Sequence, residues 1–486
     1  MDVIDKDLQS IQETRCLISK AKLAQKQYQS FSQEQIDTII EKMAKAADDA
    51  AERLAKLAFE ETGFGKWQDK VLKNQFASTI VYNRIKDMKT VGVLQDDKEN
   101  KVLEVAVPVG IIAGLIPSTN PTSTTIYKAL IALKSGNAII FSPHPSAKNC
   151  ITETVKVLNQ AAIEAGAPEG LIGCMNILTL QGTNELMSHR DTSLILATGG
   201  EAMVKAAYSS GTPAIGVGPG NGPAFIEKTA NFQLAVKRII ESKTFDNGVI
   251  CASEQSIIVE RESKDSVKAE LKKQGAYFLS PEQSEKLGSF LLRGNGTMNP
   301  QIVGKSVETI AAIAGLSIPE GTKVLISEQK TVSMKNPYSR EKLAPILAFY
   351  VEENKEAALQ RSIELLMNEG KGHSFIIHTE TEEVVKEFAL QVPVSRMMVN
   401  TPGALGGIGG TTNLFPALTL GCGAIGGSST SDNVGPENLL NIRKVSYGVK
   451  ELADLKGGNS EASNTLNLST QNVEDLVKMI LQQLAV

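Results

Sequence analysis

The sequence predicts an α/β protein built on doubly wound parallel sheets. Between residues 105 and 225, β-branched apolar runs alternate with helical segments, and Gly and Pro separate them. After Phe225 the alternation starts again, with SIIVE, TKVLISE, LAPILAFYVEE and SFIIHT as strand candidates. The chain has 486 residues, and single domains usually have about 100–200 residues. We therefore expect two α/β domains.

Three other regions have distinct patterns. From Asp5 to Lys89 apolar residues recur at three- and four-residue spacing, which predicts helices, and Gly63 ends one of them. The segment GNAIIF at 136–141 predicts the end of a helix followed by a buried strand. Residues 400–436 are dense in Gly, Ser, Thr and Pro, so we expect loops there.

Composition excludes several classes of function. The chain has 50 Lys and Arg against 54 Asp and Glu, a net charge of −4 that attracts neither nucleic acid nor anionic lipid. It has neither a secretory signal at its start nor an apolar run of about 20 residues. We expect a cytoplasmic protein without nucleic-acid or membrane partners. Five cysteines without a C-x-x-C pair indicate neither a disulfide framework nor a metal site.

The segment TFDNGVICASEQS, residues 244–256, contains the strongest candidate for a catalytic residue. It places Cys251 shortly after Asn247 and Gly248, on a turn between a helix and the next apolar run. A thiol in such a turn can be exposed to a cleft. A buried structural cysteine is the alternative interpretation, because free cysteines are among the most buried residues in proteins.

This segment resembles the cysteine motif of the aldehyde dehydrogenase superfamily, Phe-x-Asn-x-Gly-x-x-Cys, with one residue fewer between Asn and Gly. Three other stretches are similar to motifs of that family: GIIAGLIPSTNPTSTTIYKALIALKSGNAIIFSPHP at 110–145, LATGG at 196–200 and EKLAPIL at 341–347. All four occur in the family's order. The sequence of these motifs is most similar to that of the CoA-acylating (acetaldehyde dehydrogenase) subgroup. This subgroup includes the aldehyde dehydrogenase half of bifunctional alcohol/aldehyde dehydrogenases.

The resemblance implies a Rossmann-type cofactor domain, an α/β catalytic domain and a β-hairpin for oligomerisation, and hence a homo-oligomer, either a dimer or a tetramer. The implied division of the chain is a cofactor-binding domain at 1–95 and 109–234, a catalytic domain at 235–427, an oligomerisation hairpin at 96–108 and 443–451, a flexible linker at 452–471 and an amphipathic helix at 472–486.

The segment 472–486 has apolar residues at i, i+3, i+4 and i+7. A tether followed by such a helix resembles the encapsulation peptides that target enzymes to bacterial microcompartments. The resemblance implies shell proteins as partners and a location inside a microcompartment. The alternative is a helix packed against the body of the protein.

The resemblance also assigns catalytic roles. Cys251 attacks the carbonyl of a small aldehyde, while the Asn120 side chain and the Cys251 backbone N–H stabilise the oxyanion. Hydride passes to NAD or NADP, and coenzyme A then releases the acyl group from Cys251. Acetaldehyde is the default substrate, whereas propionaldehyde, longer aldehydes and an anionic one such as sulfoacetaldehyde stay open.

One departure from the wider family favours CoA as the acceptor. Hydrolytic members carry a Glu in a Glu-Leu-Gly-Gly-Lys motif, which activates water. The matching stretch here is GVGPGNGP at 216–223, where the Glu position falls on Val217 or Gly218. Without that base, the thiol of CoA is the better nucleophile. The alternatives are a hydrolytic aldehyde dehydrogenase and a binding protein that has kept the fold.

No G-x-G-x-x-G follows the first strand, so the cofactor residues come from the resemblance alone. It places Gly199 and Gly200 near the pyrophosphate at a helix N-terminus, Pro117 in the cleft and Glu341 on the nicotinamide ribose. By default a Glu in a loop before a strand is a solvated surface residue, and only the motif favours Glu341 as a cofactor contact.

The segment expected to hold the adenosine of the cofactor also departs from the family's sequence pattern. Many relatives carry Lys-Pro-x-Glu where this chain has Ser142, Pro143, His144 and Pro145. Both the ribose-holding Lys and the acid that repels a 2′-phosphate are missing, so NAD and NADP stay open. Ser142 and His144 are candidate contacts for the adenosine.

His373 has a counterpart on the substrate side of the acylating subgroup, and a structural histidine is the alternative interpretation. We interpret Cys150, Cys174 and Cys422 as packing residues.

Overall fold

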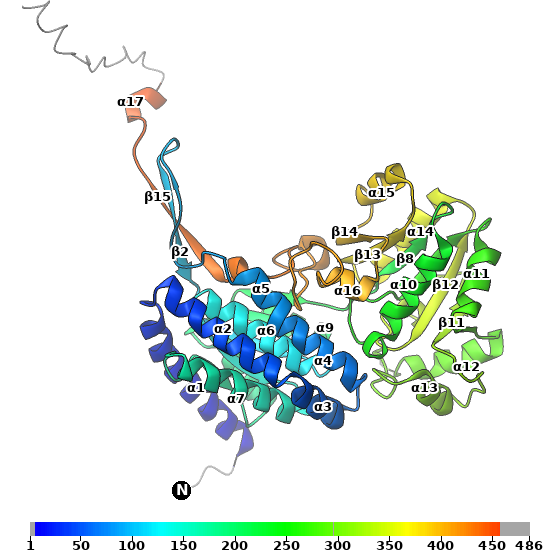
Figure 1. Cartoon of the computed structure of the whole chain (residues 1–486), viewed down its shortest axis with the longest axis horizontal. Helices are drawn as coiled ribbons and strands as arrows, with labels where there is room; N and C mark the ends of the chain where they lie inside the picture. Colours follow the sequence, from blue (N-terminus) through cyan, green and yellow to red (C-terminus); the bar gives the residue numbers. More distant parts are fainter. Residues whose placement is uncertain (1–4, 295, 457–486) are drawn as a thin grey trace, which may run out of the picture. The chain divides into compact units, whose positions relative to one another are not determined.

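The computed structural model describes residues 5–294 and 296–456 (Figure 1). They form two units. The large one contains the residues up to Gly92 and Ala106–Ile442, and the small one contains Val93–Val105 and the residues from Arg443 onward. The helix predicted at 472–486 and residues 457–471 of the predicted linker lie outside the described residues.

The chain's first part is helical, as predicted. Its elements are α1 (Lys6–Tyr28), α2 (Gln33–Asp49), α3 (Ala51–Thr62), α4 (Trp67–Gln75), a π-helical segment (Phe76–Ile80) and α5 (Val81–Ile85). Ser32 starts α2 with a reciprocal capping box to Gln35, and α3 ends directly before Gly63. α4 carries residues of the candidate site.

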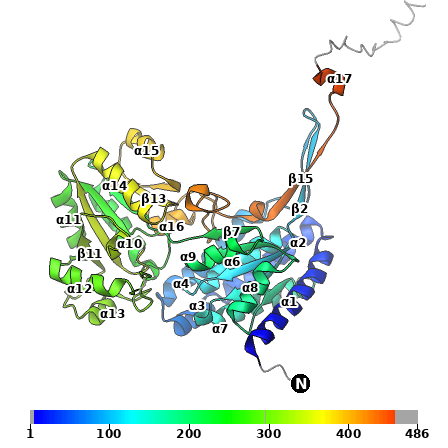
Figure 2. The ribbon, with the colours of Figure 1, turned by 180° about the vertical axis from the view of Figure 1, so that it is seen from behind.

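A five-stranded parallel sheet follows, in the order β5-β4-β3-β6-β7. Its strands are β3 (Ile111–Ile116), β4 (Ala138–Pro143), β5 (Ile172–Cys174), β6 (Thr192–Thr198) and β7 (Ala214–Val217), and its connecting helices are α6 (Pro121–Lys134), α7 (Lys148–Glu164), α8 (Leu180–Ser188) and α9 (Glu201–Ser209). Figure 1 shows α2 and α6 in front of the sheet, and Figure 2 shows α8 and α9 on its other face.

The strand order reverses beside β3, because the chain crosses from β5 to β6 on the other side of it. Such a switch point opens a crevice at the carboxyl ends of the strands, where ligands of doubly wound folds bind. All six residues of β4 are buried, so the strand predicted at 136–141 after a helix end is confirmed.

The second sheet has seven parallel strands in the order β10-β11-β12-β9-β8-β13-β14. The strands are β8 (Pro223–Ile226), β9 (Ser256–Glu260), β10 (Ala276–Phe278), β11 (Val324–Glu328), β12 (Ile346–Glu352), β13 (Gly372–His378) and β14 (Val394–Val399). The helices are α10 (Phe232–Thr244), α11 (Lys264–Lys273), α12 (Pro281–Leu291), α13 (Val307–Ala314), α14 (Lys355–Asn368), α15 (Glu382–Ala389) and α16 (Gly403–Gly407). All four strand candidates after Phe225 are strands.

β8 lies in the middle of this second sheet although it precedes residue 235, where we placed the start of the catalytic domain. The change of sheet therefore falls between Val217 and Pro223. Side chains of β8 alternate between two cores: Phe225 packs with the apolar cluster that includes Leu359 and Phe388, whereas Ala224 and Ile226 pack with the cluster of α10 and α11.

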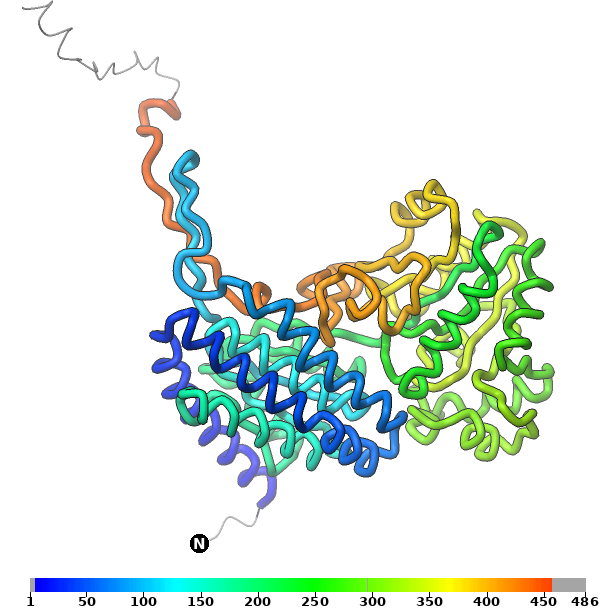
Figure 3. Tube along the Cα trace, viewed as in Figure 1, coloured from blue at the N-terminus to red at the C-terminus, as the bar shows by residue number. Residues whose placement is uncertain are grey.

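The small unit contains most of a three-stranded sheet, β1-β2-β15, formed by β1 (Gly92–Asp97), β2 (Val102–Pro108) and β15 (Leu440–Ser446). Figure 3 shows these strands as extended stretches of the trace. They overlap the hairpin that we expected at 96–108 and 443–451. The last described element is α17 (Leu452–Leu455), which is exposed and falls inside the predicted linker.

Candidate active site

Cys251 lies in a turn between α10 and β9, as the sequence indicated. The turn begins with two non-glycine residues in the left-handed region, Asp246 (φ 48°) and Asn247 (φ 53°). Asn247 Nδ2 donates to the carbonyl of Gly304 at 2.9 Å, and the Asp246 N–H donates to Asp69 at 2.7 Å. Side-chain and backbone bonds therefore hold a backbone shape that is unfavourable by itself.

Asn120 is the residue before α6, whose first position is Pro121. Its Nδ2 donates to the carbonyl of Val249 at 3.3 Å and to Thr119 Oγ1 at 3.2 Å. The structure thus places the Asn120 side-chain amide, at the start of α6, against the turn that carries Cys251. The two residues that the resemblance made catalytic lie in one site.

The Cys251 thiol lies near groups of both charges. Burial raises its pKa to about 12, the negative charges of Glu341 and Cys422 act in the same direction, and Arg396 opposes them. The thiol is consequently protonated at neutral pH in the free protein, and it must lose a proton before it can act as a nucleophile.

The loop at 216–223 touches the backbone of Cys251. A Cβ atom at Gly220 would lie 2.0 Å from the Cys251 carbonyl oxygen, so only glycine fits. The Gly220 N–H donates to Glu341 Oε1 at 2.8 Å. Glu341, expected on the cofactor ribose, therefore lies against this loop in the structure.

The two carboxylates next to this loop are both engaged. Burial, followed by the charge of Glu369, raises the pKa of Glu341 to about 8, so Glu341 is largely protonated at neutral pH. Glu369 pairs with the guanidinium of Arg340 at 2.7 Å. Glu341 thus accepts from the Gly220 N–H, and Glu369 is held in an ion pair.

His373 is completely buried near the start of β13. Its Nδ1 lies 2.9 Å from Ser374 Oγ, and no group among the described residues bonds Nε2. Burial, with help from Arg396, lowers the pKa of His373 to about 3, so the ring is neutral. Its Cε1 lies 3.2 Å from the position of a Cβ at Gly220, which places the ring beside the same loop.

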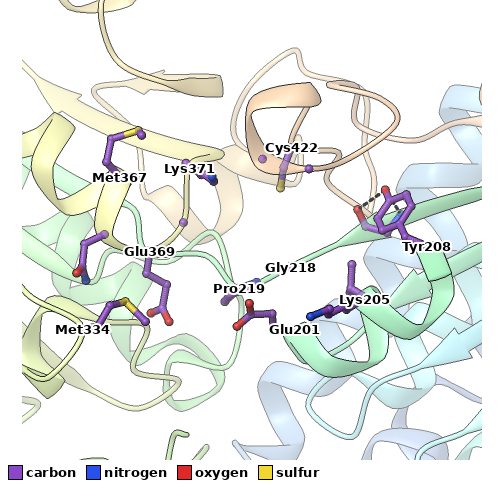
Figure 4. A pocket seen from close by; sticks show the side chains of 16 residues that line it. Glu201, Lys205, Tyr208, Gly218, Pro219, Met334, Met367, Glu369, Lys371 and Cys422 are labelled. Atoms are coloured by element: carbon purple, nitrogen blue, oxygen red, sulfur yellow. Dashed lines mark hydrogen bonds between the residues drawn. The ribbon is translucent and has the colours of Figure 1, made fainter. Parts of the chain in front are cut away.

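A cavity of about 350 Å³ adjoins this loop (Figure 4). Gly218, Glu369 and Cys422 are among its lining residues, whereas Val217 is buried at the end of β7. Of the two positions that match the missing Glu, Gly218 is therefore the one that faces open space. Cys422, which we interpreted as a packing residue, lines this cavity as well.

A second cavity of about 320 Å³ lies at the carboxyl ends of β3, β4 and β6. It is lined by five of the six residues that we expected to bind the cofactor, which are Pro117, Ser142, His144, Gly199 and Gly200. Glu341 is not among them. No Asp or Glu is among the described residues that line this cavity.

The ends of this second cavity have different polar groups. Gly200 is the N-cap of α9 and offers no side chain to the first N–H groups of that helix. Ser142 Oγ lies 3.0 Å from Thr183 Oγ1, and His144 Nδ1 accepts from the Ser146 N–H at 3.2 Å. A helix start whose first N–H groups have no side-chain cap suits a phosphate.

Sequence reasoning missed a buried ionic cluster formed by Lys70, Lys73 and Asp246. Lys70 and Lys73 are three residues apart on α4, and both pair with the Asp246 carboxylate. Two lysines at this spacing on a helix normally indicate a solvated face. The only signal was the Asp that precedes Asn247 in the cysteine motif.

All five cysteines are free, and Cys150 and Cys174 are buried. Within residues 5–294 and 296–456, no group of three or more His, Cys, Asp and Glu is arranged to hold a metal ion. No helix in those ranges is both long enough and apolar enough to cross a bilayer.

Comparison with known proteins bears on this site. The model of the aldehyde dehydrogenase family matches residues 8–405. The bifunctional aldehyde-alcohol dehydrogenase AdhE of Escherichia coli (strain K12) is 46% identical over 441 residues, which are 90% of this chain and 49% of that protein. The chain thus spans about half the length of this relative.

Two solved structures cover nearly the whole chain. The "probable aldehyde dehydrogenase" from Listeria monocytogenes EGD-e is 64% identical, with a TM-score of 0.92 over 93% of this chain and 100% of that one. An acetylating aldehyde dehydrogenase from Geobacillus thermoglucosidasius is 53% identical, with a TM-score of 0.91 over 93% and 99% of the two chains. From the family match and these likenesses it follows that the chain belongs to the aldehyde dehydrogenase family.

Proposed function

We propose that this chain is a CoA-acylating aldehyde dehydrogenase, which interconverts a short-chain aldehyde, CoA and NAD(P)⁺ with acyl-CoA and NAD(P)H. One observation carries the proposal: the loop that touches Cys251 has no carboxylate. Gly218 faces the cavity where hydrolytic relatives would carry a base, and Glu341 and Glu369 are both engaged. The loop therefore offers water no activating group at the position where hydrolytic relatives carry one, whereas a thiol does not depend on one to the same degree.

The residues have the following roles. The Cys251 sulfur adds to the aldehyde carbonyl, and the oxyanion accepts hydrogen bonds from Asn120 Nδ2 and the Cys251 N–H. NAD(P)⁺ supplies the hydride acceptor when it is bound. The thiol of CoA then attacks the acyl carbon on Cys251, the bond between that carbon and the Cys251 sulfur breaks, and the proton of the CoA thiol returns the leaving thiolate to the thiol form. His373, which is neutral and has a free Nε2, is a candidate to contact the incoming substrate.

A solved relative supports the acyl-transfer step. A propionaldehyde dehydrogenase from Rhodopseudomonas palustris, determined with bound CoA and an acylated cysteine, is 27% identical, with a TM-score of 0.81 over 89% of this chain and 97% of that one. The likeness supports small aldehydes as substrates and leaves their identity to experiment.

The cavity with Pro117, Ser142 and His144 is our candidate for the adenosine end of the cofactor, and Gly199 and Gly200 lie where α9 begins. No carboxylate lines it among the described residues, so nothing there repels a 2′-phosphate. We accordingly propose that both NAD and NADP are accepted.

We also propose that the chain forms a homo-oligomer through the sheet β1-β2-β15, whose strand β15 has large exposed side chains at Ile442 and Val445. A further proposal concerns residues 472–486, which would bind microcompartment shell proteins. A structural neighbour, 28% identical with a TM-score of 0.81, is a propionaldehyde dehydrogenase of a Clostridium phytofermentans microcompartment.

Replacing the nucleophile tests the central proposal. Cys251→Ser should lower CoA-dependent NAD(P)H formation from acetaldehyde roughly 10³-fold or more, because the thioester can no longer form. Mass spectrometry after incubation with acetyl-CoA should detect an acetyl group on Cys251 of the unmodified protein. The matched control is Cys16→Ser, at an exposed cysteine, which should keep full activity. Wild-type activity in Cys251→Ser would refute the proposal.

Restoring the missing base should change the acyl acceptor. A Cβ at Gly218 meets no atom within 4 Å, so a larger side chain fits there. Gly218→Glu should show aldehyde oxidation in the absence of CoA, with acetate as the product, because the carboxylate can activate water. Gly218→Gln has nearly the same shape and should not. If the unmodified protein already forms acetate without CoA, the hydrolytic alternative is correct.

The charge of Glu341 should affect how the reactivity of Cys251 changes with pH. Glu341 becomes charged as pH rises through about 8, and its charge raises the Cys251 pKa. Glu341→Gln removes the charge and can still accept from Gly220. We expect roughly two- to tenfold faster alkylation by iodoacetamide than in the unmodified protein at pH 9, as for a pKa lower by about 0.3–1 unit. The two proteins should match at pH 6.5. Equal rates at pH 9 would contradict this coupling.

Removal of residues 457–486 tests the last two proposals together. The shortened chain should keep its specific activity and, by light scattering, the same number of subunits per oligomer, because the active site and the small sheet are intact. It should lose co-sedimentation with assembled shell proteins. Retained co-sedimentation would exclude the targeting role, and dissociation into monomers would place the oligomer contact in the removed segment.

A further inference from the structure

We propose that Lys73 is a positioning residue that fixes the direction of the Asn120 amide toward the oxyanion, and that Asp246 holds Lys73 in place. The inference rests on the proposed function, since it concerns how Asn120 performs its role there. It adds a residue that comes from α4, outside every motif of the sequence.

The contacts of Asn120 define which end of its amide faces the thiol. Lys73 Nζ donates to Asn120 Oδ1. An ammonium group has donors and no acceptor, so the amide atom that faces it has to be the oxygen. The NH₂ end therefore points the other way, toward the Val249 carbonyl in the turn of Cys251. Without Lys73, only the long contacts of Nδ2 with the Val249 carbonyl and Thr119 Oγ1 would distinguish the two orientations, since the two ends of the amide have nearly the same shape.

The ammonium of Lys73 is itself fixed. Lys70 and Lys73 are 2% exposed, and Asp246 is fully buried between them. Asp246 Oδ2 accepts from both lysines, and Oδ1 accepts from the Lys66 N–H at 2.6 Å. A buried cation that has two oxygen partners and little space has few other positions, because an unpaired buried charge is strongly unfavourable.

Close backbone packing keeps Asp246 where it is. A Cβ at Gly65 would lie 1.8 Å from Asp246 Oδ1, and Gly65 has φ +75°, so glycine is required there for two reasons. The helix α4 also continues into the π-helical segment Phe76–Ile80. Such interruptions occur frequently at functional sites.

Asp246 belongs to the turn that carries Cys251. One carboxylate thus links the nucleophile's turn to α4 and, through Lys73, to the oxyanion donor. Lys73 also places a positive charge one hydrogen bond away from the amide, which polarises the Asn120 N–H and makes it a better donor. Burial, against the opposing charge of Asp246, lowers the pKa of Lys73 to about 8, so the lysine is mostly charged at neutral pH.

The test uses Lys73→Met in the full-length protein. Removal of one oxyanion donor typically costs about 10²–10³-fold in kcat, and a donor that is only misdirected should cost less. We expect kcat for CoA-dependent acetaldehyde oxidation to fall roughly 10- to 100-fold, with KM within about twofold of the unmodified value. Alkylation of Cys251 by iodoacetamide should persist, which shows that the turn is intact.

Lys134→Met is the matched control. Lys134 is equally buried, and its ammonium pairs with Asp37. This variant also loses a buried cation but leaves the Asn120 contacts intact, so kcat per folded molecule should not change. Lys73→Arg, which keeps charged donors, should recover part of the activity that Lys73→Met loses. If Lys73→Met does not fold, Lys73→Gln takes its place.

A double-mutant cycle with Asn120→Ala separates positioning from a general structural effect. If Lys73 acts through Asn120, Lys73→Met should lower kcat less than about threefold further in the Asn120→Ala background. Full additivity of the two losses would overturn the inference and leave the proposed function intact. An unchanged kcat in Asn120→Ala alone would remove the oxyanion role from Asn120, and with it both the role of Lys73 and that part of the proposed function.

Discussion

The Asp246 carboxylate is the group on which the arrangement of the site depends. It is fully buried, and its two oxygens accept from Lys70, Lys73 and the Lys66 N–H. Burying one carboxylate with two ammonium groups is unfavourable unless every partner is correctly placed. Precise placement is what the site gains, because the same carboxylate belongs to the turn of Cys251 and holds α4 against it.

Two parallel sheets contribute to one site in different ways. The first sheet supplies Asn120 at the start of α6 and the cavity at the carboxyl ends of β3, β4 and β6. The second supplies the turn before β9, the buried His373 and the loop that enters β8. The loop 216–223 connects the two sheets and touches Cys251 on its way. Gly220 is therefore a steric requirement of the fold, whereas Gly218 has space for a side chain. The absence of a carboxylate at Gly218 has a chemical effect instead.

Much of the fold was predictable because the spacing of apolar residues and the Gly and Pro residues that end helices and strands are local properties of the sequence. The helices before Lys89, the buried strand after Gly136 and the strands after Phe225 all follow from residues close together in the sequence. The change of sheet before β8 was not predictable in this way, since the short run PAFI gives no sign of which sheet it joins. Pairing partners are decided by contacts between distant segments.

The candidate site shows the same limit. Cys251, Asn120 and Glu341 were found through motifs, and the structure brings all three to the loop or turn around the thiol. Lys73 could not be found, because a lysine on a helix is usually solvated and its burial depends on α4 packing against a turn 173 residues later. The motif resemblance assigned Glu341 to the cofactor ribose, which stays a prediction, and in the structure Glu341 Oε1 accepts from the Gly220 N–H.

The burial that raises the Cys251 pKa to about 12 has a consequence for chemical durability. Peroxides and electrophiles modify thiolates, and sulfinic and sulfonic acids form irreversibly. At pH 7 a thiol whose pKa is raised in this way is almost entirely protonated. A cysteine buried in this way keeps its sulfur in the less reactive protonated form, and the consequence is that deprotonation becomes part of any reaction in which that sulfur acts as a nucleophile.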